Sequence, residues 1–424
     1  MHVAVIGAGL IGLCTAYEVS VRGADVTVLD SASDVANGAS YGNGGYLQSS
    51  LPDPWNAPGA SKMFINALMN SISGKGDRSA FSAPLSALPS MLRWGLQFLT
   101  YANERDFVAG LSANRDLAEY SSEAMKTLLE RQSVSFDQSE MGALIIFRKQ
   151  EALGRYQNLA SQHLSGNTRA LTLDASQTLA IEPALGEIGG QLAGAIHLPD
   201  DRAGNSRLFC QEIARLIRDR GAQLMLGQSV QKITRSQGKL KIELPETQIA
   251  CDKVVIAAGM GSREIAAKIG MKLPIAPAKG YSLSVPMSLL DTAPVHTIVD
   301  MDIHAGVNPL GNILRVAGTA EFCGLRPGVS ADRTRYLVDL ANQIFPHTTG
   351  KIDGPQCDPW GGFRPLSVDG IPIIGATPMA GVFINAGHGG LGWTLAAGSG
   401  KALAQLICDE PADFDLQRFA ADRF

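Results

Sequence analysis

The chain of 424 residues carries 36 Lys and Arg against 40 Asp and Glu, a formal net charge of -4. This balance offers no basic patch of the kind that holds nucleic acid, and a hydrophobic fraction of 45% excludes a disordered chain. The 46 glycines are roughly 11% of the residues against a usual ~7%. Because glycine serves sharp turns and close backbone approaches, the glycine-rich segments are where a ligand is expected.

Cysteine usage and the first residues bear on the compartment. The six cysteines are scattered, with no C-x-x-C pair and no Cys/His cluster, which predicts reduced thiols and no metal site. The chain begins MHVAVIGAG, straight into an apolar strand without a basic leader, so we expect it in the cytoplasm. Residues 370–400 lack charge, but Pro372, Pro378 and several glycines favour a buried strand, turn and helix over a membrane span.

The first thirty residues predict a β-α-β unit. Residues 3–7 form an apolar strand, and a helix and a second strand, DVTVLD, follow. In the G-x-G-x-x-G turn, Gly7 permits the tight turn, Gly9 admits a pyrophosphate close to the backbone, and Gly12 allows helix–strand packing. Asp30 ends the second strand, where it is expected to accept a hydrogen bond from a ribose 2′-OH. The same carboxylate would repel a 2′-phosphate, which disfavours NADP.

The remaining elements indicate a divided cofactor domain. In chain order the patterns predict a glycine- and serine-rich loop at 37–50, helix over most of 94–131, a strand at 142–148, and helices at 150–164 and 206–220. Strands are then predicted near 222–226, 229–235, 239–244, 247–251 and 252–259, and a helix after 259–261. The last part of the chain is predicted to form strands and hairpins over 280–326 with a turn at 308–312, a strand at 381–387 and a helix at 393–408. The dinucleotide-binding part is therefore predicted in at least three pieces, with a second domain inserted between them. The first motif alone does not choose between NAD and FAD, but this division favours FAD, whose length needs contacts from distant segments.

A second glycine turn, from Gly387 to Gly392, lies between a predicted strand and a predicted helix. No strand ending in an acidic residue follows, so a second dinucleotide site is not expected. We expect the positive N-terminus of that helix to stabilise negative charge on the N1 and C2=O edge of a reduced flavin. The alternative is a purely structural turn. His388, within the turn, either shapes the substrate pocket or contacts the flavin, or else packs in the core.

Arg364 lies in the glycine-rich, almost apolar stretch WGGFRPLSVDG. A buried guanidinium is costly unless it is paired, and its planar fork matches a carboxylate, so a ligand carboxylate is the expected partner. The alternative is a structural ion pair with Asp369. Tyr281 and His304 lie on strands predicted beside the pocket, where each is a candidate for substrate contact or simply part of the framework.

Residues 79–99, SAFSAPLSALPSMLRWGLQFL, are apolar with almost no charge. Such a segment is expected either to lie on a membrane surface or to pack in the core or against another subunit.

Nearly end to end, the chain resembles the FAD-dependent D-amino acid oxidase superfamily, and within it the bacterial D-amino acid dehydrogenases. The likeness is carried by VIGAGLIGLCTAYEV, GASYGNGGYLQ, DPWNAPG, RDLAEYSSEAMKTL with GALIIFR, AKGYSLSVP, LRVAGTAEFCGL, GGFRPLSVDGIPIIGAT and GHGGLGWTLAAGSGK. The resemblance implies an α/β fold, in which an FAD-binding Rossmann-like domain of the glutathione-reductase type carries an inserted α+β substrate domain on a mostly antiparallel sheet. The expected boundaries are 1–48, 199–276 and 359–424 for the FAD-binding domain, and 49–198 and 277–358 for the substrate domain.

The resemblance also implies an activity. Members oxidise D-amino acids by hydride transfer from the substrate Cα to flavin N5, and the imino acids hydrolyse to 2-oxo acids and ammonia. FAD is expected to be non-covalent, because no cysteine or histidine lies in a recognisable attachment motif. Dehydrogenases of this group pass electrons to a quinone rather than to oxygen, so peripheral contact with the inner face of the plasma membrane through 79–99 is expected. The alternatives are a dehydrogenase of D-hydroxyproline or another cyclic imino acid, a pyridine-nucleotide dehydrogenase, and a flavin-binding subunit without catalysis.

The resemblance assigns residues to both ligands. Arg364 is expected to clamp the substrate carboxylate with Tyr281 nearby, and Tyr46, His304 and His388 are the other pocket candidates. The predicted cofactor contacts are Gly7, Gly9, Leu10, Ile11, Gly12, Asp30, Ser31, Ser40, Asn43, Gly44, Gly45, Val230, Ala258, Gly259, Gly361, Gly387, Gly389, Gly390, Leu391, Gly392, Trp393 and Thr394.

Overall fold

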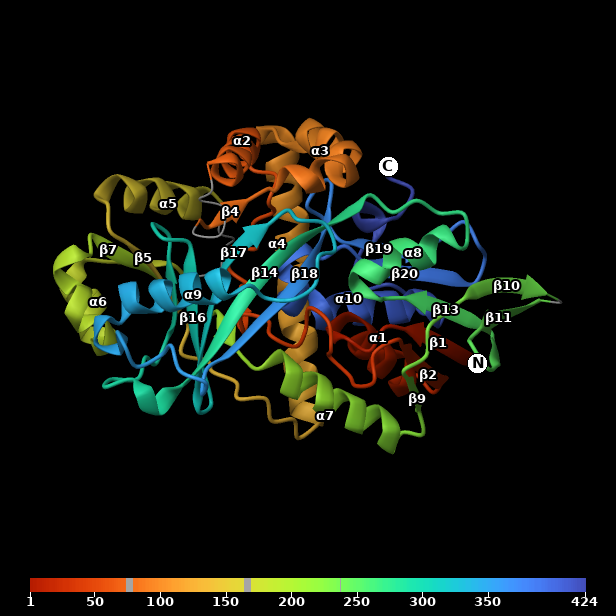
Figure 1. Cartoon of the computed structure of the whole chain (residues 1–424). Helices are drawn as coiled ribbons and strands as arrows, with labels where there is room; N and C mark the ends of the chain where they lie inside the picture. The colour runs from red at the N-terminus through yellow and green to blue at the C-terminus, as the bar shows by residue number, and fades with distance from the viewer. Residues whose placement is uncertain (74–78, 164–168, 237) are drawn as a thin grey trace.

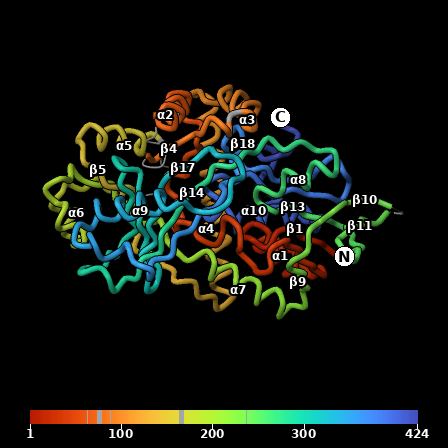
Figure 2. The backbone as a smooth tube through the Cα atoms, viewed as in Figure 1, coloured from red at the N-terminus to blue at the C-terminus, as the bar shows by residue number. Residues whose placement is uncertain are grey.

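The computed structural model describes residues 1–73, 79–163, 169–236 and 238–424. Two sheets organise these residues, one in each half of the molecule (Figure 1). The backbone tube shows the first and the last segments of the chain together in the same half (Figure 2). The chain therefore leaves the half in which it starts and returns to it.

The first sheet has six strands in the order β19, β20, β13, β1, β2 and β9. All neighbours are parallel except β19, which runs antiparallel to β20. The bounds are β1 (His2–Ile6), β2 (Asp25–Asp30), β9 (Gln223–Leu226), β13 (Lys253–Ile256), β19 (Ile373–Ala376) and β20 (Val382–Ala386). Both faces of this sheet are covered, which explains why its central strands are continuously apolar.

The two faces of the first sheet have different covers. Val3 and Val5 pack on the helical side, which is formed by α1 (Leu10–Val21), α4 (Glu104–Arg131), α7 (Ser206–Asp219) and α10 (Gly392–Ile407). Ala4 and Ile6 face the opposite core, which includes β10 (Lys232–Ser236), β11 (Lys239–Glu243), β12 (Gln248–Cys251) and α8 (Ser262–Ala267). Because successive side chains of a strand point to opposite faces, these four residues of β1 contribute to both cores.

The second sheet has nine strands and is mostly antiparallel. Its order is β18, β14, β17, β16, β15, β5, β7 and β6, with β4 paired to β17. The bounds are β4 (Phe81–Ser82), β5 (Ala143–Phe147), β6 (Leu171–Leu173), β7 (Gly194–Leu198), β14 (Ile275–Pro286), β15 (Thr297–Asp300), β16 (Ala305–Leu310), β17 (Ile313–Glu321) and β18 (Asp358–Ser367). Helices α6 (Ala175–Ile181) and α9 (Ala331–Ile344) pack on its apolar face.

The other elements connect or cap the two halves. They are α2 (Ala60–Ile72), α3 (Leu88–Tyr101), α5 (Gln150–His163), and the short pair β3 (Tyr46–Leu47) and β8 (Arg202–Ala203). Helices α2 and α3 lie together at the top of Figure 1, over the end of β4. Within the described residues, none of the helices has the length and apolar character needed to cross a membrane.

Most predicted elements are confirmed to within a few residues, although residue 164, the predicted end of one helix, lies outside the described residues. The predicted turn at 308–312 is wrong in its first half. Residues 308–310 belong to β16, where Pro309 is paired with Leu314, and the chain reverses at Gly311, whose φ is 58°. Strand β18 pairs with β14 in the nine-stranded sheet, although most of its residues fall in 359–424, which is predicted to belong to the FAD-binding domain. The domain boundaries stay a prediction.

Candidate active site

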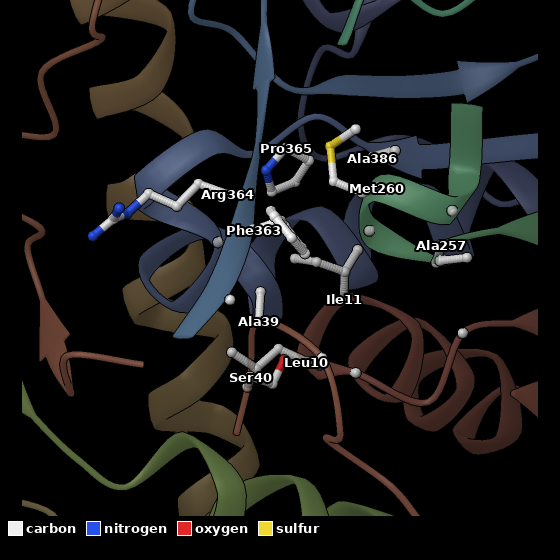
Figure 3. A pocket seen from close by; sticks show the side chains of 18 of the residues that line it. Leu10, Ile11, Ala39, Ser40, Ala257, Met260, Phe363, Arg364, Pro365 and Ala386 are labelled. Atoms are coloured by element: carbon white, nitrogen blue, oxygen red, sulfur yellow. Dashed lines mark hydrogen bonds between the residues drawn. The ribbon is translucent and has the colours of Figure 1, made fainter. Parts of the chain in front are cut away.

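A cavity of about 590 Å³ lies between the two sheets. Its lining comes from segments far apart in the sequence, as the close view shows (Figure 3). One wall is formed by residues after β1, β2, β9, β13 and β20, at the carboxyl ends of the parallel strands, and the other by β14, β17 and β18. This edge of an open parallel sheet is where α/β proteins bind their ligands.

The first glycine turn fits its predicted role. Gly7 has φ 122°, and a Cβ there would lie 2.3 Å from the Ala257 carbonyl oxygen. A Cβ on Gly12 would lie 1.8 Å from the carbonyl oxygen of Gly7, so the helix packs against the turn only without a side chain. Gly9 caps the start of α1, and Gly7, Gly9, Leu10 and Ile11 line the cavity. The helix N-terminus is therefore open to an anionic group, as a pyrophosphate would require.

Asp30 is held by the backbone around it. Its carboxylate oxygens accept hydrogen bonds from the N–H of Ala8 at 2.7 Å and from the N–H of Ala32 at 2.8 Å. Asp30 and Ser31 line the cavity, together with Val230, Ala258 and Gly259 from neighbouring strand ends. Asp30 thus fixes the glycine turn, and its contact with a ribose stays a prediction.

The second glycine turn lies at the other end of the cavity. Gly387 and Gly389 have φ 77° and 55°, and α10 begins at Gly392. Gly387, Gly389, Gly390, Gly392 and Trp393 line the cavity. A helix N-terminus again faces the ligand space, as expected for stabilising an anionic edge of a flavin.

Arg364 lies on β18 with its side chain against the cavity wall. Figure 3 shows the guanidinium pointing away from Phe363 and Pro365, which lie on the opposite side of the strand. Its Nη1 donates to the Thr319 carbonyl oxygen at 3.2 Å, and its Cζ is 5.5 Å from the centre of the Trp55 ring. Burial lowers the pKa of Arg364 to about 10, which still leaves the group cationic at neutral pH.

The alternative of an Arg364–Asp369 ion pair is wrong. Asp369 is bound by Arg423, with Nε to Oδ2 at 2.7 Å and Nη2 to Oδ1 at 3.2 Å. Among the residues that the structure describes, no carboxylate forms an ion pair with Arg364. A half-buried cation that has one backbone acceptor among the described residues is unfavourable on its own, so this site favours an anionic ligand.

Two backbone features give Arg364 its place. A Cβ on Gly280 would lie 2.2 Å from Nη1, so only glycine leaves room for the guanidinium across β14. Opposite Gly280 the β14–β17 register shifts, and Thr319 has a left-handed φ of 67°. This bulge presents the Thr319 carbonyl oxygen to the guanidinium, while the buried Thr319 hydroxyl has no hydrogen-bond partner in the part of the chain that the structure describes. Bulges that re-aim groups are common beside active sites.

His388 is buried and electrically neutral. Burial lowers its pKa to about 3, and its Nε2 has no hydrogen-bond partner among the described residues. It borders both the main cavity and a side cavity of about 20 Å³, which Trp55 and Phe98 also line. An orphaned ring nitrogen next to the ligand space indicates a contact made with a ligand.

Tyr281 lines the cavity and donates its hydroxyl proton to the Glu321 carboxylate. Burial and this carboxylate raise the pKa of Tyr281 well above its usual value, so the phenol stays protonated. Tyr281 can therefore pack against a ligand or accept a hydrogen bond from it, but it cannot act as a base.

Several predicted contacts do not line this cavity. The Tyr46 hydroxyl donates to the fully buried Asp201, and His304 lies at φ 53° in the β15–β16 turn with its ring edge-on to Phe81. Thr394 accepts a hydrogen bond from the Gln48 N–H at 3.0 Å. The others are Gly12, Gly45 and Leu391, which pack behind the residues that do line it. The partners of Tyr46 and Thr394 lie 155 and 346 residues away in the chain, so sequence spacing does not show them.

Some lining residues were not predicted. Trp360 packs over two glycines, since a Cβ on Gly42 or on Gly362 would lie 2.3 or 2.1 Å from its ring. Residues 228–229 and 260–261, and the two neighbours of Arg364, Phe363 and Pro365, also line the cavity. The signal available for the first two groups was their position directly after a parallel strand.

The residues present fit FAD. The cavity is long, reaches two helix N-termini, and is bordered by glycines whose missing side chains admit a ligand to the backbone. Phosphates suit the first helix end and a flavin suits the apolar wall beside Trp360.

Comparisons with known proteins agree with this geometry. A family model described as FAD dependent oxidoreductase (DAO) matches residues 2–406. D-amino acid dehydrogenase of Vibrio vulnificus strain CMCP6 is 31% identical over 426 residues, covering 99% of this chain and 100% of that protein. The crystal structure of glycine oxidase from Geobacillus kaustophilus is similar with a TM-score of 0.73 at 22% identity, covering 100% and 98% of the two chains. That of L-proline dehydrogenase from P. horikoshii gives 0.76 at 16% identity, covering 100% and 97%. These likenesses confirm the predicted fold class.

Proposed function

This chain belongs to the FAD dependent oxidoreductase (DAO) family, and from that premise we propose that it oxidises D-amino acids. The substrate loses a hydride from Cα and a proton from its amine, which gives an imino acid. Water then adds to the C=N bond and releases a 2-oxo acid and ammonia. The two electrons pass on to a non-oxygen acceptor, for which we propose a quinone.

The observation that carries this proposal is the unpaired guanidinium of Arg364. It is half-buried against the cavity, keeps its charge, and has one backbone acceptor at 3.2 Å. A carboxylate accepts two parallel hydrogen bonds from such a fork. Relatives named D-amino acid dehydrogenase, similar over their full length, support an amino acid as the source of that carboxylate.

The bound cofactor supplies the two-electron acceptor for the Cα–H bond. The protein contributes position: Arg364 holds the carboxylate, which restricts the orientation of Cα against the wall of β14 and β18. The backbone N–H groups at the start of α10 would stabilise the negative charge that a bound flavin gains on reduction. His388 and Tyr281 each lack the capacity to take a proton near neutral pH, so the substrate amine is expected to react in its neutral form.

Anaerobic reduction of the flavin tests the proposal. The holoenzyme is mixed with matched D- and L-amino acids, and with D-proline and D-hydroxyproline, and bleaching of the visible flavin band is followed. We expect bleaching by D-amino acids and not by their L-isomers. Arg364→Leu should lower kcat/KM at least about 100-fold, while Arg335→Leu, an exposed arginine on α9, should not change it. Bleaching only by the cyclic compounds would favour the imino acid alternative, and no bleaching by any compound would contradict catalysis.

The apolar face of α2 and α3 supports a membrane acceptor. Among the side chains that the structure describes, seven exposed large apolar ones fall between residues 65 and 99: Ile65, Met69, Ile72, Leu85, Leu92, Leu96 and Leu99. The two helices carry one charge each, Lys62 and Arg93, and both are positive. Exposed apolar groups with cations and no acid suit the surface of an anionic bilayer, where quinones reside. We therefore propose this α2–α3 face as the peripheral membrane contact.

Vesicle binding tests the α2–α3 face. The holoenzyme should sediment with phosphatidylglycerol vesicles, and Leu92→Glu with Leu96→Glu should abolish sedimentation while activity with a soluble dye is kept. Leu171→Glu, an exposed leucine on β6, is the matched control and should sediment as the parent does. Equal sedimentation of all variants would contradict this contact.

A further inference from the structure

The loop of residues 40–45 is enclosed between the cavity and the nine-stranded sheet. Gly42, Asn43 and Gly44 line the cavity. On its other side the loop touches the sheet: a Cβ on Gly44 would lie 3.4 Å from the side chain of Ala317, and one on Gly45 would lie 2.9 Å from Leu310. The loop therefore packs closely against the sheet, and its carbonyl and N–H groups have to point either to the sheet side or to the cavity.

Three buried side chains bind the carbonyl oxygens of this loop. The Ser206 hydroxyl donates to the Ser40 carbonyl oxygen at 2.8 Å, and the Ser282 hydroxyl donates to that of Gly42 at 2.7 Å. Arg315 Nη1 donates to the Asn43 carbonyl oxygen at 3.0 Å. The donors come from α7, β14 and β17, and all three residues are buried. Two of them therefore reach the loop from the substrate-side sheet.

The N–H groups of the loop are used differently. The Tyr41 N–H donates to the Gly38 carbonyl oxygen at 3.0 Å, and the Gly45 N–H donates to Asn43 Oδ1 at 2.8 Å. In the part of the chain that the structure describes, no hydrogen bond takes the N–H groups of Gly42, Asn43 and Gly44. Gly42 is buried and Asn43 and Gly44 are partly buried, and three successive amides without a protein acceptor beside a cavity form a site for an oxygen atom of a ligand.

We propose that Ser282 and Arg315, aided by Ser206, are positioning residues for FAD. By holding the carbonyl oxygens toward the sheet, they leave the amides of Gly42, Asn43 and Gly44 to bind an oxygen of the cofactor. That oxygen belongs either to the pyrophosphate or to a carbonyl of the flavin ring. The substrate-side sheet is thereby coupled to the affinity for FAD. This inference rests on FAD binding alone and is independent of the substrate.

FAD retention in single variants tests the coupling. The dissociation constant is measured by titrating apoprotein with FAD, and the temperature of flavin release from holoenzyme is compared with the unfolding temperature of apoprotein by circular dichroism. Ser282→Ala and Arg315→Met should each raise the Kd about 5- to 10-fold and lower the release temperature more than the apoprotein unfolding temperature. Ser282→Thr, which keeps the hydroxyl, should restore affinity. Ser284→Ala is the matched control, since Ser284 lies on the same face of β14 and makes no side-chain hydrogen bond among the described residues.

The flavin spectrum identifies the bound oxygen. A shift of the visible band in Ser282→Ala together with a raised Kd assigns the amides to a flavin carbonyl, and a raised Kd with an unchanged band assigns them to the pyrophosphate. The proposal is overturned if Ser282→Ala and Arg315→Met both bind FAD with a Kd within about two-fold of the parent's. It is also overturned if each variant lowers the flavin-release temperature of the holoenzyme and the unfolding temperature of the apoprotein by the same amount. If Ser282→Ala does not fold as apoprotein, the comparison of Arg315→Met with Arg315→Lys decides on the same criteria.

Discussion

Arg423 holds Asp369 through a forked ion pair, and this pair removes the one acid near Arg364 in the sequence. The side chains of Asp369 and Arg423 are 10% and 15% exposed, so the pair is largely shielded from water. Arg423 also donates to the Ile371 carbonyl oxygen at 2.8 Å and thus ties residues 369–371 to the C-terminal segment. The neutralisation of Asp369 is a condition for Arg364 to attract an external carboxylate.

Breaking this pair should destabilise the fold. Arg423→Gln leaves the Asp369 carboxylate buried without its partner, so we expect the free energy of unfolding to fall by about 2 kcal/mol. Arg418→Gln is the control, because its pair with Asp116 is exposed and should contribute less than about 0.5 kcal/mol. Denaturant unfolding measures both, and equal losses in the two variants would contradict a special role for the buried pair.

Gly280→Ala should impair substrate binding more than folding. The added methyl group would meet the guanidinium of Arg364, the far end of a flexible side chain that can move aside. We expect kcat/KM to fall about 10- to 100-fold, because the clamp is displaced, with stability within about 1 kcal/mol of the parent. Gly306→Ala, in the same sheet with its nearest atom 3.9 Å away, should leave kcat/KM unchanged. An unaltered KM in Gly280→Ala would argue against Arg364 as the carboxylate clamp.

His388 should make stability depend on pH. Its folded pKa of about 3 lies below the unfolded value of ~6.5, so the unfolded chain binds the proton first as pH falls. Its contribution is fully present above about pH 6.5 and is lost at about 1.4 kcal/mol per pH unit as pH falls toward the folded pKa. His388→Asn lacks this contribution, while His197 and His304, whose pKa values are also lowered, remain in both proteins. Denaturation between about pH 4 and pH 7 should show a shallower slope in the variant, and identical slopes would contradict a neutral buried His388.

Relieving the bulge at Thr319 should stabilise the protein. A β-branched residue with φ 67° is strained, and its buried hydroxyl lacks a partner. Thr319→Gly removes both costs and is expected to raise the free energy of unfolding by about 1 kcal/mol, after the greater entropy of glycine in the unfolded chain is subtracted. Thr319→Val keeps the strain and removes only the hydroxyl, so it should gain less. A loss of stability in Thr319→Gly would show that the side chain contributes a contact that outweighs the strain.

Local patterns predicted the framework well, because they depend on neighbours in the sequence. The glycines at 7, 9 and 12 and the apolar run of β1 follow from backbone sterics and the burial of a parallel strand. The predictions of side-chain contacts that were wrong concern residues whose partners lie far away in the sequence. Tyr46 turns to Asp201, 155 residues later, and Asp369 turns to Arg423, 54 residues later. No spacing rule distinguishes these partners from the pocket, so side-chain direction had to come from the structure.

The shared indole of Trp360 has a consequence for altering this enzyme by mutation. Because the ring occupies the space above both Gly42 and Gly362, neither glycine can gain a side chain while the tryptophan is present. A substitution at Trp360 would open both positions at once, so the effects of changes at 42, 360 and 362 will not add. Substitutions in this wall of the pocket therefore have to be made in order, with position 360 changed first. A library that varies one residue at a time is expected to yield no tolerated substitution at Gly42 or Gly362.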